Sequence, residues 1–139
     1  MSAARSLLLI YFTLGGLGDM LQVAAVLLAL LGIAHSILGE RYILIRLFRR
    51  EALPHLFGGP EFTRRTLRFA WHLTTVLAFA LAAVLWQLAE EASPAALVRT
   101  IGWALILGGL LPLVHTRGRH LSWLVLFAAG GLCLFWAAP

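Results

Sequence analysis

Four long apolar stretches, none of which contains an acidic residue, dominate this sequence. They cover residues 20–38, 67–88, 95–114 and 121–138. A bilayer core needs about 20 mostly apolar helical residues to cross it. The pattern therefore predicts an all-α membrane protein, a bundle of four transmembrane helices in a single domain over residues 20–139.

The composition agrees with a membrane location. Of the 139 residues, 61% are hydrophobic and 12% are charged, whereas soluble domains average roughly 45–50% apolar and about 25% charged residues. All 11 basic residues are Arg, and they lie in short gaps between the apolar stretches. A nucleic-acid-binding face needs soluble surface on which to spread its basic residues. We therefore do not expect nucleic acid as a partner.

The Arg residues are distributed unevenly between the two sides of the predicted bundle. Most lie in the first loop, residues 39–66, and in the third loop, while the opposite side holds only Arg5 and Arg99. Short loops rich in Arg stay in the cytoplasm. The sequence therefore predicts a multi-pass protein of the bacterial inner (cytoplasmic) membrane, with both termini outside the cytoplasm.

Residues 1–19 form an apolar, glycine-rich extension before the first span. The apolar part ends at Leu14, which is too short to cross a bilayer, and Gly15 and Gly16 then interrupt it. A secretory leader would need a small-residue cleavage site that is not evident here. We expect an interfacial or partner-contacting segment, or an extension upstream of a true start at Met20.

An amphipathic segment lies within the first loop. Its apolar and basic residues occupy different faces of a helix, with Ile43, Leu44, Leu47 and Phe48 on one and Arg46, Arg49 and Arg50 on another. This pattern is typical of a helix in the headgroup plane, with Arg against anionic lipid headgroups. The alternative is an ordinary amphipathic connector.

Histidines gather at the predicted cytoplasmic ends of the spans. At a rise of ~1.5 Å per residue, His35 and His72 lie ~5–8 Å below the same membrane surface. His115 ends the third span and His120 begins the fourth. Every span therefore presents an imidazole near one membrane face, and we predict a shared polar pocket there.

The second span adds a polar stripe to this pocket. Arg65, Arg68, His72 and Thr75 follow helical spacing and share a face. Polar groups at membrane depth need partners or a water-filled cavity, so this face is predicted to point into the bundle, towards Glu40. The candidate ligand-binding residues are Glu40, Arg65, Arg68 and Thr75, and the candidate metal ligands are His35, His72, His115 and His120.

The sequence therefore predicts that the pocket binds a small ligand, and haem or a transition metal is the sharpest form of this hypothesis among three chemistries. His35 and His72 on facing helices match axial ligands of a haem iron. Several imidazoles with Glu40 match Zn or Fe, although no single-helix spacing of a metal site is present. Arg65 and Arg68 match a phosphate or carboxylate, with a histidine exchanging protons. The structural alternative is that these side chains only hydrogen-bond to backbone, headgroups or each other.

Other function classes find less support. The first span lacks the deep carboxylate that small multidrug exporters need. The chain has no Asn, which argues against a fluoride channel. It also has no G-x-S-x-G turn, which argues against nucleophilic catalysis by a serine. The sequence therefore favours a protein that is not an enzyme. Small residues along the spans predict close helix approach. These small residues favour an alternative function, as an accessory subunit of a larger membrane complex or as a homo-oligomer. A third possibility is an oligomeric channel or carrier.

Two runs of residues carry a resemblance. Residues 35–41 (HSILGER) and residues 64–74 (RRTLRFAWHLT) resemble those of small bacterial inner-membrane proteins of four predicted spans. The likeness covers roughly residue 20 to the end of the chain. It implies the fold and the membrane, and it supplies no catalytic residues.

Overall fold

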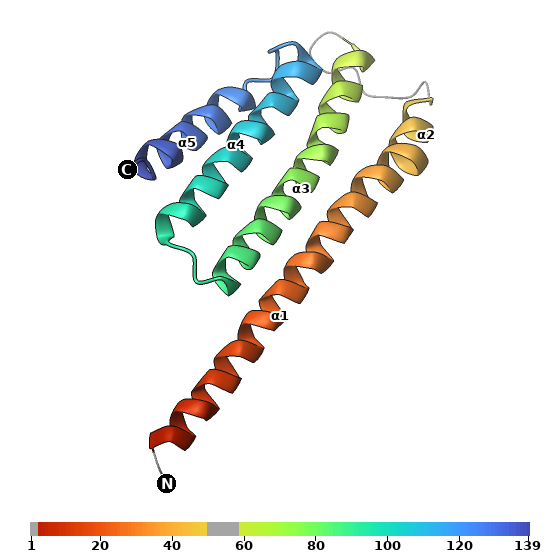
Figure 1. Ribbon diagram of the computed structural model, residues 1–139. Helices are drawn as coiled ribbons and strands as arrows, with labels where there is room; N and C mark the ends of the chain where they lie inside the picture. The colour runs from red at the N-terminus through yellow and green to blue at the C-terminus, as the bar shows by residue number, and fades with distance from the viewer. Residues whose placement is uncertain (1–2, 50–58) are drawn as a thin grey trace.

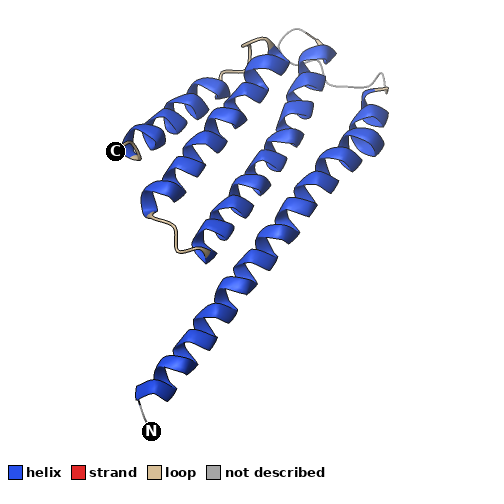
Figure 2. Cartoon of the chain, in the orientation of Figure 1, coloured by secondary structure: helices blue, strands red, loops and turns tan. Residues whose placement is uncertain are grey.

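The computed structural model describes residues 3–49 and 59–139, with side chains from Gly16 onward. Its elements are all helical (Figure 2), which confirms the all-α class. In chain order they are α1 (Ala3–Leu38), the π-helix η1 (Gly39–Leu44), α2 (Ile45–Phe48), α3 (Pro60–Ala89), α4 (Pro94–Thr116) and α5 (Ser122–Trp136). Part of the predicted first loop, including Arg50, lies outside the described residues.

The first helix is longer than the predicted span. α1 runs through Gly15 and Gly16 without a break, so residues 3–19 extend the span as helix. Glycine lowers helix stability by about 1 kcal/mol per position, which a long apolar helix can absorb. At its other end, α1 continues directly through η1 into α2 along nearly the same line (Figure 1). The amphipathic segment is thus helical, as a continuation of α1.

Local sequence explains where the later helices begin and end. Pro60 and Pro94 occupy the first turns of α3 and α4, where a missing amide hydrogen has no cost. The Ser93 side chain accepts a hydrogen bond from the Ala96 amide and so caps the start of α4. Gly118 adopts a φ of 77° in the turn after α4, and its amide donates to the Leu113 carbonyl.

The helices α1, α3, α4 and α5 form a row. α1 packs against α3, α3 against α4 and α4 against α5, and successive helices run in opposite directions (Figure 1). Among the described residues, α1 makes no extensive packing with α4 or α5. The sequence predicted a bundle of four helices, and the structure has the four helices, arranged as a row. Short connections favour packing between sequence neighbours, and a row of this kind encloses no common interior.

Three of the helices are long and apolar enough to cross a bilayer, namely α3, α4 and the continuous segment Gly16–Phe48. The predicted fourth span corresponds to α5, a helix of 15 residues. It falls short of the about 20 residues that a perpendicular crossing needs. The molecule thus has the features of a multi-pass membrane protein with three candidate spans and one shorter apolar helix.

Small residues hold α4 and α5 close together, as the sequence predicts. A Cβ at Gly130 would lie 2.9 Å from the Gly102 carbonyl oxygen, and one at Gly109 would lie 2.6 Å from the Phe127 ring. Such faces let helices approach where lipid removes the usual hydrophobic drive. This close contact fixes the short turn between α4 and α5, which carries Arg117, Arg119 and His120.

Candidate functional site

A polar network joins the end of α1 and the start of η1 to α3. Glu40 in η1 accepts two contacts from the Arg68 guanidinium, from Nη2 at 2.8 Å and from Nε at 3.2 Å. The Glu40 carboxylate also lies 3.4 Å from His72 Nε2. The Arg68 guanidinium in turn lies over the Phe48 ring, 5.1 Å from its centroid. Glu40 therefore ties two predicted site residues of α3 to η1.

His72 uses both of its ring nitrogens in this network. Its Nδ1 shares a hydrogen bond of 2.8 Å with Ser36 Oγ. Because a carboxylate only accepts hydrogen bonds, Nε2 carries the hydrogen towards Glu40. Ser36, His72 and Glu40 have the residue types of a nucleophilic triad, but α1 is helical through Ser36, so its amides are held in the helix and offer no oxyanion hole.

His35 has a separate environment one position earlier in α1. Its ring stacks on Trp71 with centroids 4.4 Å apart and planes at 5°, and its Nε2 shares a 2.8 Å hydrogen bond with Thr74 Oγ1. The Trp71 indole N–H donates to the His35 carbonyl at 3.1 Å. This arrangement requires Gly39, because a Cβ there would overlap the indole. His35 and His72 thus lie at one level, as predicted, with different partners.

The other two histidines lie elsewhere in the row. His115 Nδ1 donates to the Leu111 carbonyl of its own helix at 2.9 Å. His120 Nδ1 pairs with Ser122 Oγ at 2.8 Å. Within residues 3–49 and 59–139, no group of three or more His, Cys, Asp or Glu side chains is placed to hold a metal ion. The helices form a row, so the four imidazoles do not share one pocket.

Haem or metal binding by His35 and His72 stays a prediction. Both ring nitrogens of His72 have partners, so His72 would first have to release one of them, and His35 would have to release Thr74 to coordinate through Nε2. An absorbance spectrum and a metal analysis of the purified protein test it, and loss of a Soret band or of stoichiometric metal in the double variant His35→Ala, His72→Ala would identify the ligands.

The predicted stripe on α3 divides into two parts. Arg68 and His72 face Glu40, and Thr75 is buried at 7% exposure beside the α1 helix. Arg65 instead pairs with Glu61 on its own helix, with 2.7 Å between Nε and Oε1. Arg65 also borders a cavity on the side of α3 that faces the α4–α5 turn. The split follows from α3 having a neighbour on each side.

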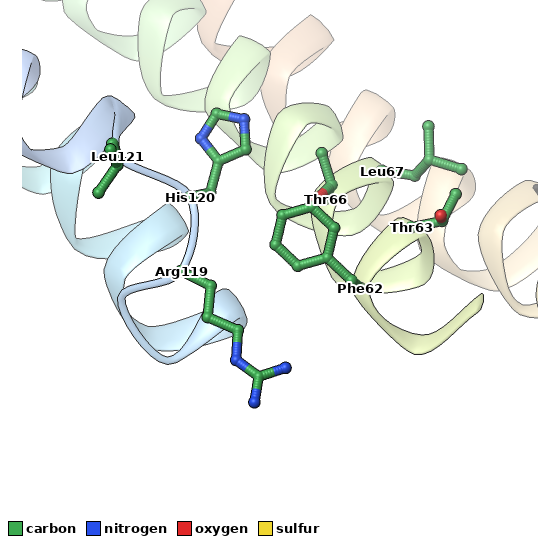
Figure 3. A pocket seen from close by; sticks show the side chains of 7 residues that line it. All are labelled: Phe62, Thr63, Thr66, Leu67, Arg119, His120 and Leu121. Atoms are coloured by element: carbon green, nitrogen blue, oxygen red, sulfur yellow. The ribbon is translucent and has the colours of Figure 1, made fainter. Parts of the chain in front are cut away.

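Two adjoining cavities lie between the amino end of α3 and the α4–α5 turn. One, of about 210 Å³, has walls that are about half polar, formed by Glu61, Phe62, Arg65, Thr116, Arg117 and Arg119; we call it the polar cavity. The other, of about 500 Å³, has mostly apolar walls, formed by Phe62, Thr63, Thr66, Leu67, Arg119, His120 and Leu121 (Figure 3). Its size falls within the range of about 300–1,000 Å³ that is usual for ligand pockets.

Aromatic contacts fix the wall that the two cavities share. The His120 ring lies edge-on to Phe69, with centroids 4.9 Å apart, and nearly parallel to Phe62 at 6.4 Å. The His120 amide donates to Thr116 Oγ1 at 3.0 Å. Thr116 is itself only 2% exposed and bonds to the Pro112 carbonyl. The turn is therefore held against α3.

Unpaired polar groups border these cavities. Among the described residues, the Arg117 and Arg119 side chains have no hydrogen bond or ion pair, and the buried Thr66 Oγ1 also has no partner. Arg117 adopts a left-handed φ of 53°, a conformation that costs a non-glycine residue about 1 kcal/mol or more.

The sequence interpretation included Arg65 and His120 among its candidates but missed the cavities themselves. Two features of the sequence could have indicated them. One is the basic turn Arg117-Gly118-Arg119, and the other is the aromatic pair Phe62 and Phe69, seven residues apart on one face of α3.

Comparison of the chain with models of protein families, with curated proteins and with solved structures finds no match. The resemblance of residues 35–41 and 64–74 to small bacterial inner-membrane proteins therefore stays a prediction. What the protein does has to be inferred from the geometry of its described residues.

Proposed function

We propose that this small multi-span helical protein binds an anionic ligand, of phosphate or carboxylate chemistry, between the amino end of α3 and the α4–α5 turn. One observation carries the proposal: Arg117 and Arg119 border a polar cavity of about 210 Å³ and have no partner among the described residues. The function is binding, with no catalytic step.

The charge around the polar cavity favours an anion. Arg65, Arg117 and Arg119 contribute three positive charges to its wall, and Glu61 contributes one negative charge. Glu61 is already paired with Arg65, which leaves the two Arg of the turn for a ligand. Guanidinium groups bind phosphate and carboxylate through paired, charge-assisted hydrogen bonds.

The conformation of the turn supports the same proposal. Arg117 occupies the left-handed position after α4, where glycine is the usual residue. Strain of this kind persists where the surrounding structure holds it and often lies at binding sites. With the excess of Arg at this end of the molecule, we place the ligand on the cytoplasmic side of a bacterial inner membrane.

Titration with inorganic phosphate in a neutral detergent, at constant ionic strength, tests the proposal. Trp123 is a suitable reporter because its indole N–H donates to the Gly118 carbonyl, between the two Arg of the turn. We expect a saturable change in tryptophan fluorescence that disappears in the Trp123→Phe variant. Arg117→Gln and Arg119→Gln should each weaken binding about tenfold, since a charge-assisted hydrogen bond is lost.

The matched control is Arg41→Gln, which removes the same charge from an exposed position of η1 that borders neither cavity. It should leave the phosphate titration unchanged. A response to phosphate that is not saturable, or that Arg41→Gln weakens as much as Arg117→Gln does, would contradict the proposal.

Membership in a larger assembly is the second candidate, and the row of helices favours it. Among the described residues, α3 is the long helix against which α1 packs extensively. Apolar side chains elsewhere on the surface of α1, such as Met20, Leu27 and Leu31, are 60–68% exposed. A homo-oligomer or a larger membrane complex would cover this surface. The mass of the purified protein in detergent, measured by light scattering, distinguishes a monomer from an assembly.

A further inference from the structure

We infer that the anionic ligand is a membrane phospholipid, held with its phosphate at Arg117 and Arg119 and with one acyl chain in the apolar cavity. This inference builds on the proposed anion site and names its ligand class. The geometry that points to a lipid is the direct contact of a polar cavity with an apolar one of more than twice its volume.

The two cavities are adjacent and share part of their walls. Phe62 and Arg119 line both of them. On α3, Glu61 and Arg65 border the polar cavity, whereas Thr63, Thr66 and Leu67 border the apolar one. These positions alternate along the helix, so the two cavities lie against neighbouring faces of the same turns of α3. A ligand that fills both therefore needs a charged part beside an apolar part, as a phospholipid has.

A soluble anion would leave most of this space unused. The walls of the larger cavity are mainly apolar, and Leu67 and Leu121 on them are 39% and 65% exposed. Covering such side chains with a hydrocarbon chain is favourable when they would otherwise face water at the interface. Figure 3 shows Leu121 and His120 on one side of the space and Phe62 and Thr66 on the other.

The place of the two cavities in the fold also agrees with a lipid ligand. They lie between α3 and the turn that joins α4 to α5, which carries Arg117 and Arg119. Basic pockets between transmembrane helices on the cytoplasmic side are known to bind anionic lipid headgroups.

The test compares three probes on the full-length protein in neutral detergent: dioleoyl phosphatidic acid, dioleoyl phosphatidylcholine and inorganic phosphate. We expect phosphatidic acid to bind at least about tenfold more tightly than either of the others, because only it offers both an exposed phosphate and a chain. Arg117→Gln should weaken both phosphatidic acid and inorganic phosphate.

A second variant separates the chain from the head group. Leu121→Gln places a polar side chain at an exposed position on the wall of the apolar cavity. It should weaken phosphatidic acid several-fold and leave inorganic phosphate unchanged. Leu124→Gln is the matched control, because Leu124 is also exposed on α5 and borders neither cavity.

The outcomes distinguish the two proposals. If inorganic phosphate binds in an Arg117-dependent manner and phosphatidic acid binds no more tightly, the lipid inference is wrong and the anion site stands. Equal binding of phosphatidylcholine, or phosphatidic acid binding that Leu121→Gln leaves intact, also overturns the lipid inference. If neither anionic probe binds, both proposals fail.

Discussion

The polar network joins α3 to α1 and η1, whereas the cavities lie between α3 and the α4–α5 turn, so the two regions use different sides of α3. In the network, the side chains of Ser36, Glu40, Arg68 and His72 all have partners within the protein. At the cavities, Arg117 and Arg119 have none among the described residues.

This difference separates two uses of polar residues near a membrane. A network whose members satisfy one another fixes the position of two helices and makes the structure more rigid. Cations beside an open cavity are available to a ligand. The positions of His and Arg in the sequence therefore indicate how deep these residues lie in the membrane. Their partners in the fold indicate whether they hold helices together or are available to bind a ligand.

The largest expected effect tests the close contact on the network side. Gly39→Ala would place a Cβ in the Trp71 indole and should cost about 1–3 kcal/mol of unfolding free energy, as overpacking does. Unfolding in mixed detergent micelles, followed by circular dichroism, measures it. Gly131→Ala is the control, because its Cβ would meet no atom within 4 Å. Equal stability of the two variants would contradict the arrangement around Trp71.

The next effect tests whether Glu40 and Arg68 act as a pair. A double-mutant cycle with Glu40→Gln and Arg68→Gln should give a coupling free energy of up to about 1.7 kcal/mol, since such cycles between membrane helices average about 0.6 kcal/mol and reach about 1.7 kcal/mol. Both side chains are about a third exposed, so solvent weakens the pair and the lower part of the range is expected. Additive effects of the two substitutions would show that the pair does not stabilise the packing of α1 on α3.

A smaller effect compares one hydroxyl from each region. Ser36→Ala removes the partner of His72 Nδ1 and should cost about 0.5–1.5 kcal/mol, the net value of a typical hydrogen bond. Thr66→Val removes a hydroxyl that has no partner among the described residues, so it should leave the stability unchanged or raise it. The same unfolding assay measures both, and a loss at Thr66 as large as that at Ser36 would contradict the comparison.

In the last comparison, a substitution in each region should leave the property of the other region unchanged. His72→Ala should leave the binding of inorganic phosphate unchanged, because His72 contacts Ser36 and Glu40 and borders neither cavity. Arg119→Gln should leave the unfolding free energy unchanged, because its exposed side chain pairs with no described residue. A phosphate affinity that falls in the His72 variant would mean that the two regions are coupled through α3.

The amino-acid sequence by itself determined the helices and the membrane character. Apolar runs of about 20 residues fix both, because backbone polar groups in lipid must be satisfied within a helix. It also determined local starts, such as the Ser93 cap, and the common level of His35 and His72, since the rise along a helix is constant.

Only the tertiary structure decided which polar residues meet. The sequence placed Arg65 and Arg68 on one stripe, yet Arg68 contacts Glu40 of η1 and Arg65 borders the polar cavity. Arrangement in a row or in a closed bundle depends on packing between helix faces distant in sequence, which periodicity along one helix does not encode. For the same reason His120 lies against Phe62 and Phe69, away from the histidines with which it was grouped.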